Sequence, residues 1–185
     1  MQHPDQPVLS LSEWLVLCLV CEKPTHGQAM VSLLSQGGAL GRVWRVHKAG
    51  VYRAVERLEL LGLIRTVGQE PSHQGPIRSL LKATAAGRAT ARAWLSRPAA
   101  HVRDIRSELL VKLALLDRAG DDPQELLAAQ HAQLTPVAAA FDGHLRSATG
   151  FDRTLILWRY ETISAAIRFL EALPSPSPPL ADLPA

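Results

Sequence analysis

The segment spanning residues 48–82 constrains the fold of this 185-residue chain more than any other, because its pattern changes from helix to strand. Residues 48–61 place apolar side chains on one side of a helix and polar or cationic ones on the other. Gly62 then provides a helix stop. Residues 63–67 and 77–82 have the composition of strands and are separated by turn formers. We therefore predict an amphipathic helix followed by a β-hairpin.

Three further helices complete the predicted N-terminal domain. Ser10 and Glu13 have the spacing of a capping box, so a buried helix is expected over the apolar run that follows. A second helix is expected over residues 26–35, and Thr84 is the predicted cap of a fourth helix over residues 85–95. The order helix, helix, helix, strand, strand, helix is typical of a winged helix-turn-helix domain. The predicted fold class is therefore mainly α (α+β).

The remainder of the chain is predicted to be helical. We place the winged helix-turn-helix domain at residues 1–97 and an all-helical dimerisation or effector domain at residues 98–173. Pro136 predicts a kink or break in one of its helices. The last helix, residues 152–173, has an apolar band that is wide enough for two partners. Residues 174–185 are rich in proline and are expected to be disordered.

Charge is distributed unevenly along the chain. Residues 1–97 contain twelve Lys and Arg against six Asp and Glu, a formal charge of +6, whereas residues 98–185 have a formal charge of −3. A basic module that meets a polyanion, joined to a module with another role, explains this asymmetry. Ordinary surface charge is the alternative explanation.

The apolar pattern and the cysteine content indicate a cytoplasmic protein without a membrane partner. The longest apolar run, residues 14–21, has eight residues, whereas a membrane-spanning helix needs roughly 20. No Lys or Arg precedes this run, as one would in a secretory signal. Cys18 and Cys21 are the two cysteines of the chain and are too few to hold together a fold of this size.

The polar side of the third helix carries the residues that we expect to meet DNA. Lys48, Tyr52 and Arg53 lie in its first turns, where a recognition helix approaches bases and phosphates. The planar guanidinium of Arg53 suits bidentate contact with guanine. Tyr52 either donates to a phosphate or packs on the wing. The predicted DNA contacts are Arg42, Arg45, Lys48, Tyr52, Arg53, Arg57, His73 and Arg78.

Several other side chains have two interpretations each. His26 either contacts the DNA backbone or caps the second helix, and capping is favoured. Trp94 and Trp158 are candidates for stacking on a ligand, although core or interface packing is favoured. Cys18 and Cys21 form a C-x-x-C pair without a second such pair or a histidine pair, which favours core packing over a metal or redox site. We expect no metal and no cofactor, and no motif of an enzyme is found.

Three motifs resemble those of one family of regulators. Residues 22–27, EKPTHG, resemble the E-x-P-x-H-G stretch between the first two helices of PadR-like transcriptional regulators. Val51-Tyr52, followed by residues 57–64, RLELLGLI, resembles the recognition helix and first wing strand of that family. Residues 83–88, ATAAGR, resemble the start of its fourth helix. The resemblance covers about residues 9–97 and continues more loosely into a C-terminal helical domain of the kind that longer members have.

The resemblance implies both a function and an assembly. PadR-like regulators are homodimers joined largely through their C-terminal helices, and many are repressors that a small molecule releases from DNA. The resemblance therefore implies a homodimeric repressor that binds a two-fold operator in double-stranded DNA and responds to a small-molecule effector. The dimer contact is expected on the last helix, at Leu155, Ile156, Ile163, Ile167 and Leu170.

Two alternative functions stay open. One is a winged-helix module that binds another protein and has no specific operator. The other is a thiol-based redox sensor that uses Cys18 and Cys21. The basic N-terminal half favours DNA binding over both alternatives.

Overall fold

The computed structural model describes residues 8–70 and 78–173. The chain divides into two compact units, Met1–Ser96 with Leu110–Ala119 and Arg97–Leu109 with Gly120–Ala185. The predicted boundary near residue 97 therefore needs one correction, because residues 110–119 belong with the first unit. The physical reason is that Val111 and Leu115 of this segment join the first unit's hydrophobic core.

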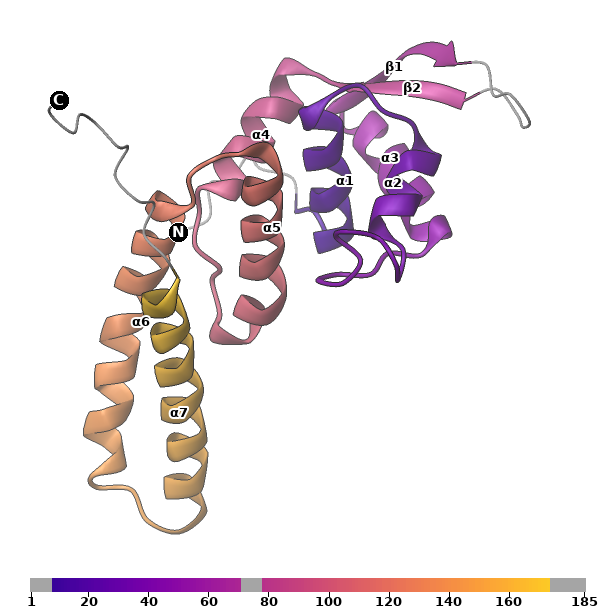
Figure 1. Cartoon of the computed structure of the whole chain (residues 1–185). Coiled ribbons are helices and arrows are strands. Elements are labelled where there is room, and N and C mark those ends of the chain that lie inside the picture. Colours follow the sequence, from indigo (N-terminus) through magenta and orange to yellow (C-terminus); the bar gives the residue numbers. More distant parts are fainter. Residues whose placement is uncertain (1–7, 71–77, 174–185) are drawn as a thin grey trace, which may run out of the picture. The chain divides into compact units, whose positions relative to one another are not determined.

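The first unit has the element order of a winged helix-turn-helix, as predicted (Figure 1). Its elements are α1 (Leu11–Glu22), α2 (Gly27–Leu34), α3 (Lys48–Leu60), β1 (Ile64–Glu70), β2 (Arg78–Ala83), α4 (Ala85–Leu95) and α5 (Leu110–Ala119). The predicted fold class, mainly α with one small sheet, is confirmed for the described residues. Within residues 8–70 and 78–173, no helix is both long and apolar enough to cross a bilayer.

Helix α1 lies in the middle of the first unit's core. The Ser10 N–H donates to Glu13 Oε2 at 2.6 Å and the Glu13 N–H donates to Ser10 Oγ at 3.4 Å, which confirms the predicted capping box. All residues from Trp14 to Val20 are buried. A helix that is apolar on every side needs neighbours on every side, and α3, α4, α5 and β2 provide them.

The antiparallel strands β1 and β2 form the wing. At its base, Ile64 is paired with Ala83 and both side chains are buried. One position further out, Arg65 is paired with Lys82 and both side chains are exposed. Successive side chains of a strand alternate between its two faces, so the wing has one face on the core and one cationic face in solvent.

The strand β1 is longer than the sequence predicted. The register shifts between Thr66 and Gly68, as at a β-bulge, and pairing then continues to Glu70, which lies opposite Arg78. The residues from Gly68 to Glu70 were expected in the loop because they are turn formers. Their pairing with β2 keeps them extended.

A backbone bridge ties the wing to the turn between α1 and α2. The Thr25 N–H donates to the Leu81 carbonyl at 3.0 Å, and the Leu81 N–H donates to the Thr25 carbonyl at 2.8 Å. This pair of hydrogen bonds fixes the start of α2 beside β2. It therefore brings residues that are more than 50 positions apart in the sequence into one site.

Helix α4 approaches the end of α3 closely. Thr84 caps α4, as predicted, by accepting from the Gly87 N–H at 3.0 Å, and its own hydroxyl donates to the Gly62 carbonyl at 2.8 Å. Gly62 has a φ of 66°, the left-handed conformation that ends α3. A β-carbon on Gly87 would collide with the Leu63 carbonyl oxygen. Only glycine therefore permits this packing.

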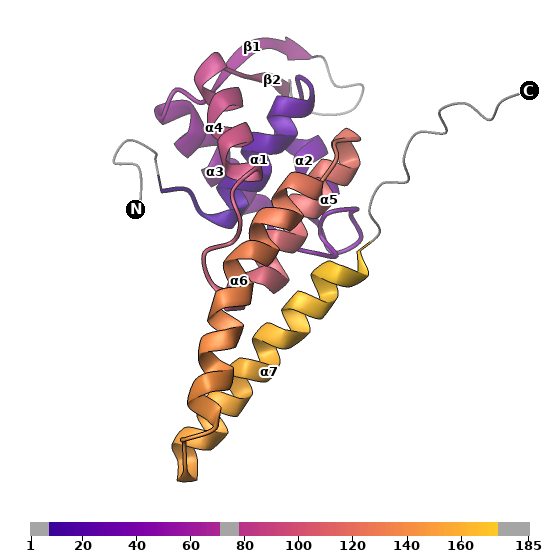
Figure 2. The same cartoon turned by 90° about the vertical axis from the view of Figure 1, so that its left-hand side faces the viewer.

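The second unit contains two long helices, α6 (Gln124–Leu145) and α7 (Gly150–Ala172), which lie side by side in both views (Figures 1 and 2). A 3₁₀ turn at Val102–Asp104 and a π-helical turn at Ile105–Leu109 also belong to this unit. Helix α6 continues through Pro136, where a kink or break was expected, so the helix does not break there. Next to it, the Thr135 hydroxyl donates to the His131 carbonyl at 2.9 Å.

A buried glutamine fastens the start of the second unit to α6. The side chain of Gln130 is fully buried. It accepts from the Ala99 N–H at 2.7 Å and donates to the Ala99 carbonyl at 3.2 Å. Both polar ends of the amide are thus satisfied, as burial of such a group requires.

Candidate nucleic-acid interface

Helix α3 presents its predicted polar side to solvent. Val51, Ala54 and Leu58 are at most 3% exposed, which confirms the predicted inner side of the helix. Glu56 and Glu59 are exposed toward its C-terminal end. The four residues that were predicted to contact DNA from this helix are all exposed: Lys48, Tyr52, Arg53 and Arg57. A helix with this division between a buried and a cationic side has the form that docks in a major groove.

The loop before α3 carries two more of the predicted cations. Arg42 and Arg45 are both exposed. The loop folds back tightly onto the end of α2, because a β-carbon on Gly41 would collide with the Ser35 carbonyl oxygen. A backbone held in this way limits where the two guanidinium groups can reach, and keeps them near the start of α3.

His26 caps α2, which was the favoured interpretation of this residue. Its Nδ1 accepts from the Ala29 N–H at 3.1 Å. A neutral imidazole carries one ring hydrogen, so acceptance at Nδ1 places that hydrogen on Nε2. The Nε2 atom lies 3.5 Å from Nη1 of Arg78 on β2.

Tyr52 packs on the first turn of α2. A β-carbon on Gly27 would lie 2.7 Å from Cε1 of Tyr52 and 3.2 Å from its hydroxyl oxygen. The side chain is nevertheless 40% exposed. The half-buried ring thus has α2 as a packing partner, a contact that the sequence did not indicate.

The side chains of His26, Tyr52 and Arg78 line a surface pocket of about 460 Å³ between α2, α3 and the wing. Lys48, Glu59 and Ser79 contribute further polar groups to its lining. The Thr66 hydroxyl donates to Glu59 Oε1 at 2.9 Å, which ties the wing to the last turn of α3. The pocket therefore combines cations and hydrogen-bond donors from three elements.

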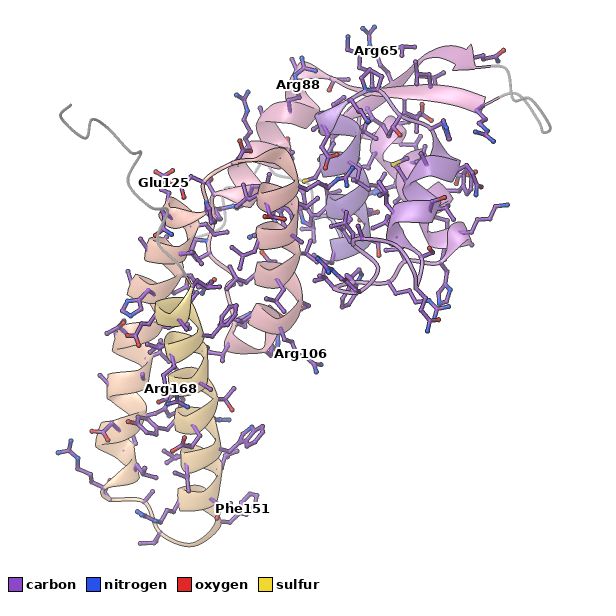
Figure 3. The ribbon with its side chains drawn as sticks, viewed as in Figure 1. Arg65, Arg88, Arg106, Glu125, Phe151 and Arg168 are labelled. Carbon is purple, nitrogen blue, oxygen red and sulfur yellow. The ribbon has the colours of Figure 1, made fainter. Side chains whose placement is uncertain are left out.

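The wing differs in part from the predicted site. Arg78 is exposed, and the predicted contact His73 lies outside the described residues. Arg65 and Lys82 are exposed on the solvent face of the wing, although the sequence prediction did not include them. Their alternation with Ile64 and Ala83 could have identified them. Figure 3 shows Arg65 on the wing and Arg88 on α4, both directed outward.

The two cysteines are free thiols in or near the core. Burial raises the pKa of the Cys18 thiol far above its usual range. Burial also raises the pKa of Cys21 to about 11, although Arg88 and Arg92 act in the opposite direction. Because the thiolate is the reactive form, both side chains are inert thiols at neutral pH. No cluster of three or more metal-ligating side chains exists within residues 8–70 and 78–173.

The two tryptophans singled out for ligand stacking differ in their surroundings. Trp94 is 4% exposed and stacks on Trp14 with ring centroids 4.8 Å apart. Nζ of the buried Lys112 lies 4.7 Å from the centroid of the Trp94 ring. Trp94 therefore has the core role that was favoured and offers no face to a ligand. Trp158 is 70% exposed.

Helix α7 has two apolar sides rather than one. Ile163 and Leu170 are buried and Ile156 and Ile167 are half-buried, on the side of the helix that packs against α6. Four of the five residues predicted for a dimer contact thus lie inside the helical hairpin. Leu155 lies instead on the exposed side, together with Phe151, Trp158, Ala165 and Phe169.

Comparison with solved structures finds several similar chains. Bacillus subtilis PadR in complex with operator DNA is 17% identical, with a TM-score of 0.46 over 88% of this chain and 96% of that one. Bacillus subtilis PadR in complex with p-coumaric acid is 15% identical, with a TM-score of 0.42 over 93% and 96%. The smu.1604c protein of Streptococcus mutans is 13% identical, with a TM-score of 0.41 over 86% and 95%. No curated protein matches the sequence significantly.

The sequence itself matches a family model. The match is to the transcriptional regulator PadR-like family and covers residues 16–93. This range begins within α1, ends within α4, and includes all of α2, α3 and the described part of the wing. The winged helix-turn-helix unit of this chain is thus similar to the PadR-like family of transcriptional regulators over residues 16–93.

Proposed function

We propose that this chain regulates transcription by binding double-stranded DNA with α3 in the major groove. The observation that carries the proposal is the division of α3 into a fully buried side, at Val51 and Leu58, and an exposed side with Lys48, Tyr52 and Arg53. Arg53 suits bidentate contact with a guanine, and the surrounding cations suit phosphates. The match of residues 16–93 to a family of transcriptional regulators supports the same function.

The second part of the proposal is a homodimer that forms through α7. The exposed apolar side of this helix has the alternating four- and three-residue spacing of a coiled-coil seam. Phe151 is 78% exposed and Trp158 is 70% exposed. A soluble protein rarely leaves a contiguous stripe of large apolar side chains in water. A second copy of the chain carries the same stripe, and two-fold pairing of the copies buries both. The seam consists of Phe151, Leu155, Trp158, Thr162, Ala165 and Phe169.

The third part concerns regulation. We infer a repressor that a small-molecule effector releases from DNA, as the resemblance to PadR-like regulators implies. Trp158 is the better of the two tryptophans for stacking on an effector, because Trp94 is buried. A ligand on Trp158 would lie in the α7 seam and would act on the geometry of the dimer. Because DNA is the proposed partner, we expect the protein in the cytoplasm.

Selection from a random pool of DNA duplexes tests this function. The full-length protein should enrich a two-fold sequence with half-sites about 10 bp, or a multiple of it, apart. The complex should contain two chains, and its affinity should fall steeply as salt rises, because neutralised phosphates release counterions. Weak binding that is indifferent to sequence would instead favour the alternative of a protein-interaction module.

The remaining alternative, a redox sensor, has an observation against it. Cys18 is buried and the pKa of both thiols is raised, so neither residue provides a reactive thiolate. Treatment of the DNA complex with hydrogen peroxide should therefore leave its affinity unchanged. A loss of binding that Cys18→Ala with Cys21→Ala prevents would restore the sensor hypothesis.

A further inference from the structure

Two hydrogen-bond donors from distant parts of the chain face each other in the pocket between α2, α3 and the wing. Nη1 of Arg78 lies 3.5 Å from Nε2 of His26. A guanidinium has donors only, and Nε2 carries the ring hydrogen because Nδ1 already accepts from the Ala29 N–H. Two donors cannot satisfy each other. The arrangement therefore leaves room for an acceptor that both can share.

A third donor lies at the same place. The Tyr52 ring packs on Gly27, the residue that follows His26, and its hydroxyl oxygen would be 3.2 Å from a β-carbon there. None of the hydrogen bonds between described residues engages this hydroxyl. Lys48 lies one helical turn before Tyr52 and lines the same pocket. Residues at the start of α2, on α3 and on β2 thus bring donors to one pocket, whose lining also includes the Glu59 carboxylate.

Glu59 is the acidic residue among those that line the pocket, and one of its oxygens already has a donor. The Glu59 carboxylate accepts from the Thr66 hydroxyl at 2.9 Å. This hydrogen bond holds the carboxylate beside the wing, where Thr66 is paired with Leu81.

We propose that His26, Tyr52 and Arg78 together hold one backbone phosphate of the DNA duplex, an inference that rests on the proposed DNA-binding function. A phosphate offers several acceptor oxygens and one negative charge, which matches two neutral donors and one guanidinium. The pocket adjoins the exposed side of α3. A phosphate held there fixes the depth and rotation of α3 in the groove, whatever the base sequence.

A duplex of arbitrary sequence is a sufficient probe, because phosphate contacts do not depend on base sequence. The binding of a fluorescent duplex of about 20 bp to the full-length protein is measured by anisotropy over a series of salt concentrations. The variants are His26→Ser, Tyr52→Phe and Arg78→Ala. Serine keeps a helix cap at position 26 but cannot reach the pocket. Arg92→Ala removes an exposed cation of α4 and is the matched control.

The three variants should differ in a defined way. Arg78→Ala should lower the slope of log K against log salt by about 0.9, the value for one phosphate contact, whereas Arg92→Ala should leave it unchanged. His26→Ser and Tyr52→Phe should weaken binding about three- to tenfold at an unchanged slope, because a neutral donor releases no counterion. His26→Ser combined with Arg78→Ala should weaken binding less than the product of the two single effects, since both donors serve one phosphate.

Two failures can be told apart. If the wild-type protein binds no duplex even at low salt, the proposed DNA-binding function itself is wrong. If the wild type binds while His26→Ser has no effect, or the two effects simply multiply, or Arg92→Ala lowers the slope as much as Arg78→Ala, the phosphate site is overturned and DNA binding stands. Thermal unfolding of each variant checks that the fold is retained.

Discussion

The ring of Tyr52 lies against Gly27 so closely that any β-carbon at residue 27 would meet Cε1 at 2.7 Å. Gly27→Ala should therefore displace the ring and weaken DNA binding about three- to tenfold, the effect of losing one hydrogen bond to a phosphate. The melting temperature should hold or rise, because alanine favours the helix that begins there. Gly37→Ala is the control, since a β-carbon at Gly37 meets nothing within 4 Å. Equal affinities of the two variants would contradict a role for the Tyr52 position.

Gly87 permits the close approach of α4 to the Leu63 carbonyl. Gly87→Ala should lower the free energy of unfolding by about 1–3 kcal/mol, because the backbone must shift to admit the methyl group. Gly143 lies within α6 with open space around it, so Gly143→Ala should instead stabilise by about 0.5–1 kcal/mol. Urea denaturation checks that Gly87→Ala lowers the free energy of unfolding and that Gly143→Ala raises it. A neutral Gly87→Ala variant would show that α4 adapts without cost.

Arg53 is exposed in the second turn of α3. Arg53→Ala should weaken binding to the selected operator by about 1–3 kcal/mol and relax the sequence preference at one base pair. Arg103→Ala removes a guanidinium that is 80% exposed in the second unit and should leave affinity unchanged. Binding is measured by gel shift at fixed salt. Wild-type affinity of Arg53→Ala would remove the base contact assigned to this residue.

Trp158 lies in the α7 seam, whereas its neighbour Leu157 lies outside it and is also exposed. Trp158→Lys should convert the proposed dimer to monomer, because it places two like charges in the apolar contact. Leu157→Lys should leave the dimer intact, and both changes preserve helix propensity. Sedimentation velocity separates the two species. If Leu157→Lys dissociates the dimer and Trp158→Lys does not, the interface lies on another side of α7.

The buried thiols make stability sensitive to alkali. Burial raises the pKa of Cys18 and Cys21 above the ordinary value of 9.0, in the case of Cys21 to about 11. Below about pH 8 both the folded and the unfolded states keep these protons, and the contribution to stability is complete. As pH rises above that value, the unfolded chain loses thiol protons that the folded chain retains, so the free energy of unfolding falls. The wild type should lose more stability than the Cys18→Ala, Cys21→Ala double variant between about pH 8 and about pH 10.5. Equal losses of stability in the wild type and the double variant would contradict this prediction.

The sequence predicted the order of elements in the first unit because local signals mark each of them. The capping box at Ser10 and Glu13, the cap at Thr84 and the stop at Gly62 all lie where expected. Each of these depends on hydrogen bonds or dihedral angles within a few residues. The end of β1 was misplaced because pairing with β2, rather than local composition, keeps Gly68 to Glu70 extended.

The candidate site was predictable only in part. Periodicity alone placed Lys48, Tyr52 and Arg53 on the outer side of α3, and their exposure agrees. The proximity of His26 to Arg78 depends on the bridge between Thr25 and Leu81, which joins segments that no local pattern links.

The sequence was equally unable to predict which side of α7 is left exposed for a dimer contact. The helix has enough apolar residues for two sides, and the sequence of α7 alone does not say which side α6 covers. In the structure Ile163 and Leu170 are buried, whereas Leu155 and Trp158 are exposed. Four of the five residues expected in a dimer contact therefore lie on the side of α7 that packs against α6, and the proposed seam uses the other side.

The bridge between Thr25 and Leu81 has a mechanical consequence. A ribbon of only two strands is marginally stable alone and would swing at its root. The two backbone hydrogen bonds of the bridge anchor that root to the turn between α1 and α2. The distance between the wing and α3 is thereby set before any duplex arrives. Under the proposed DNA-binding function, a duplex whose groove width departs from that distance would have to deform to dock, so we expect selection of DNA by stiffness as well as by the edges of its bases.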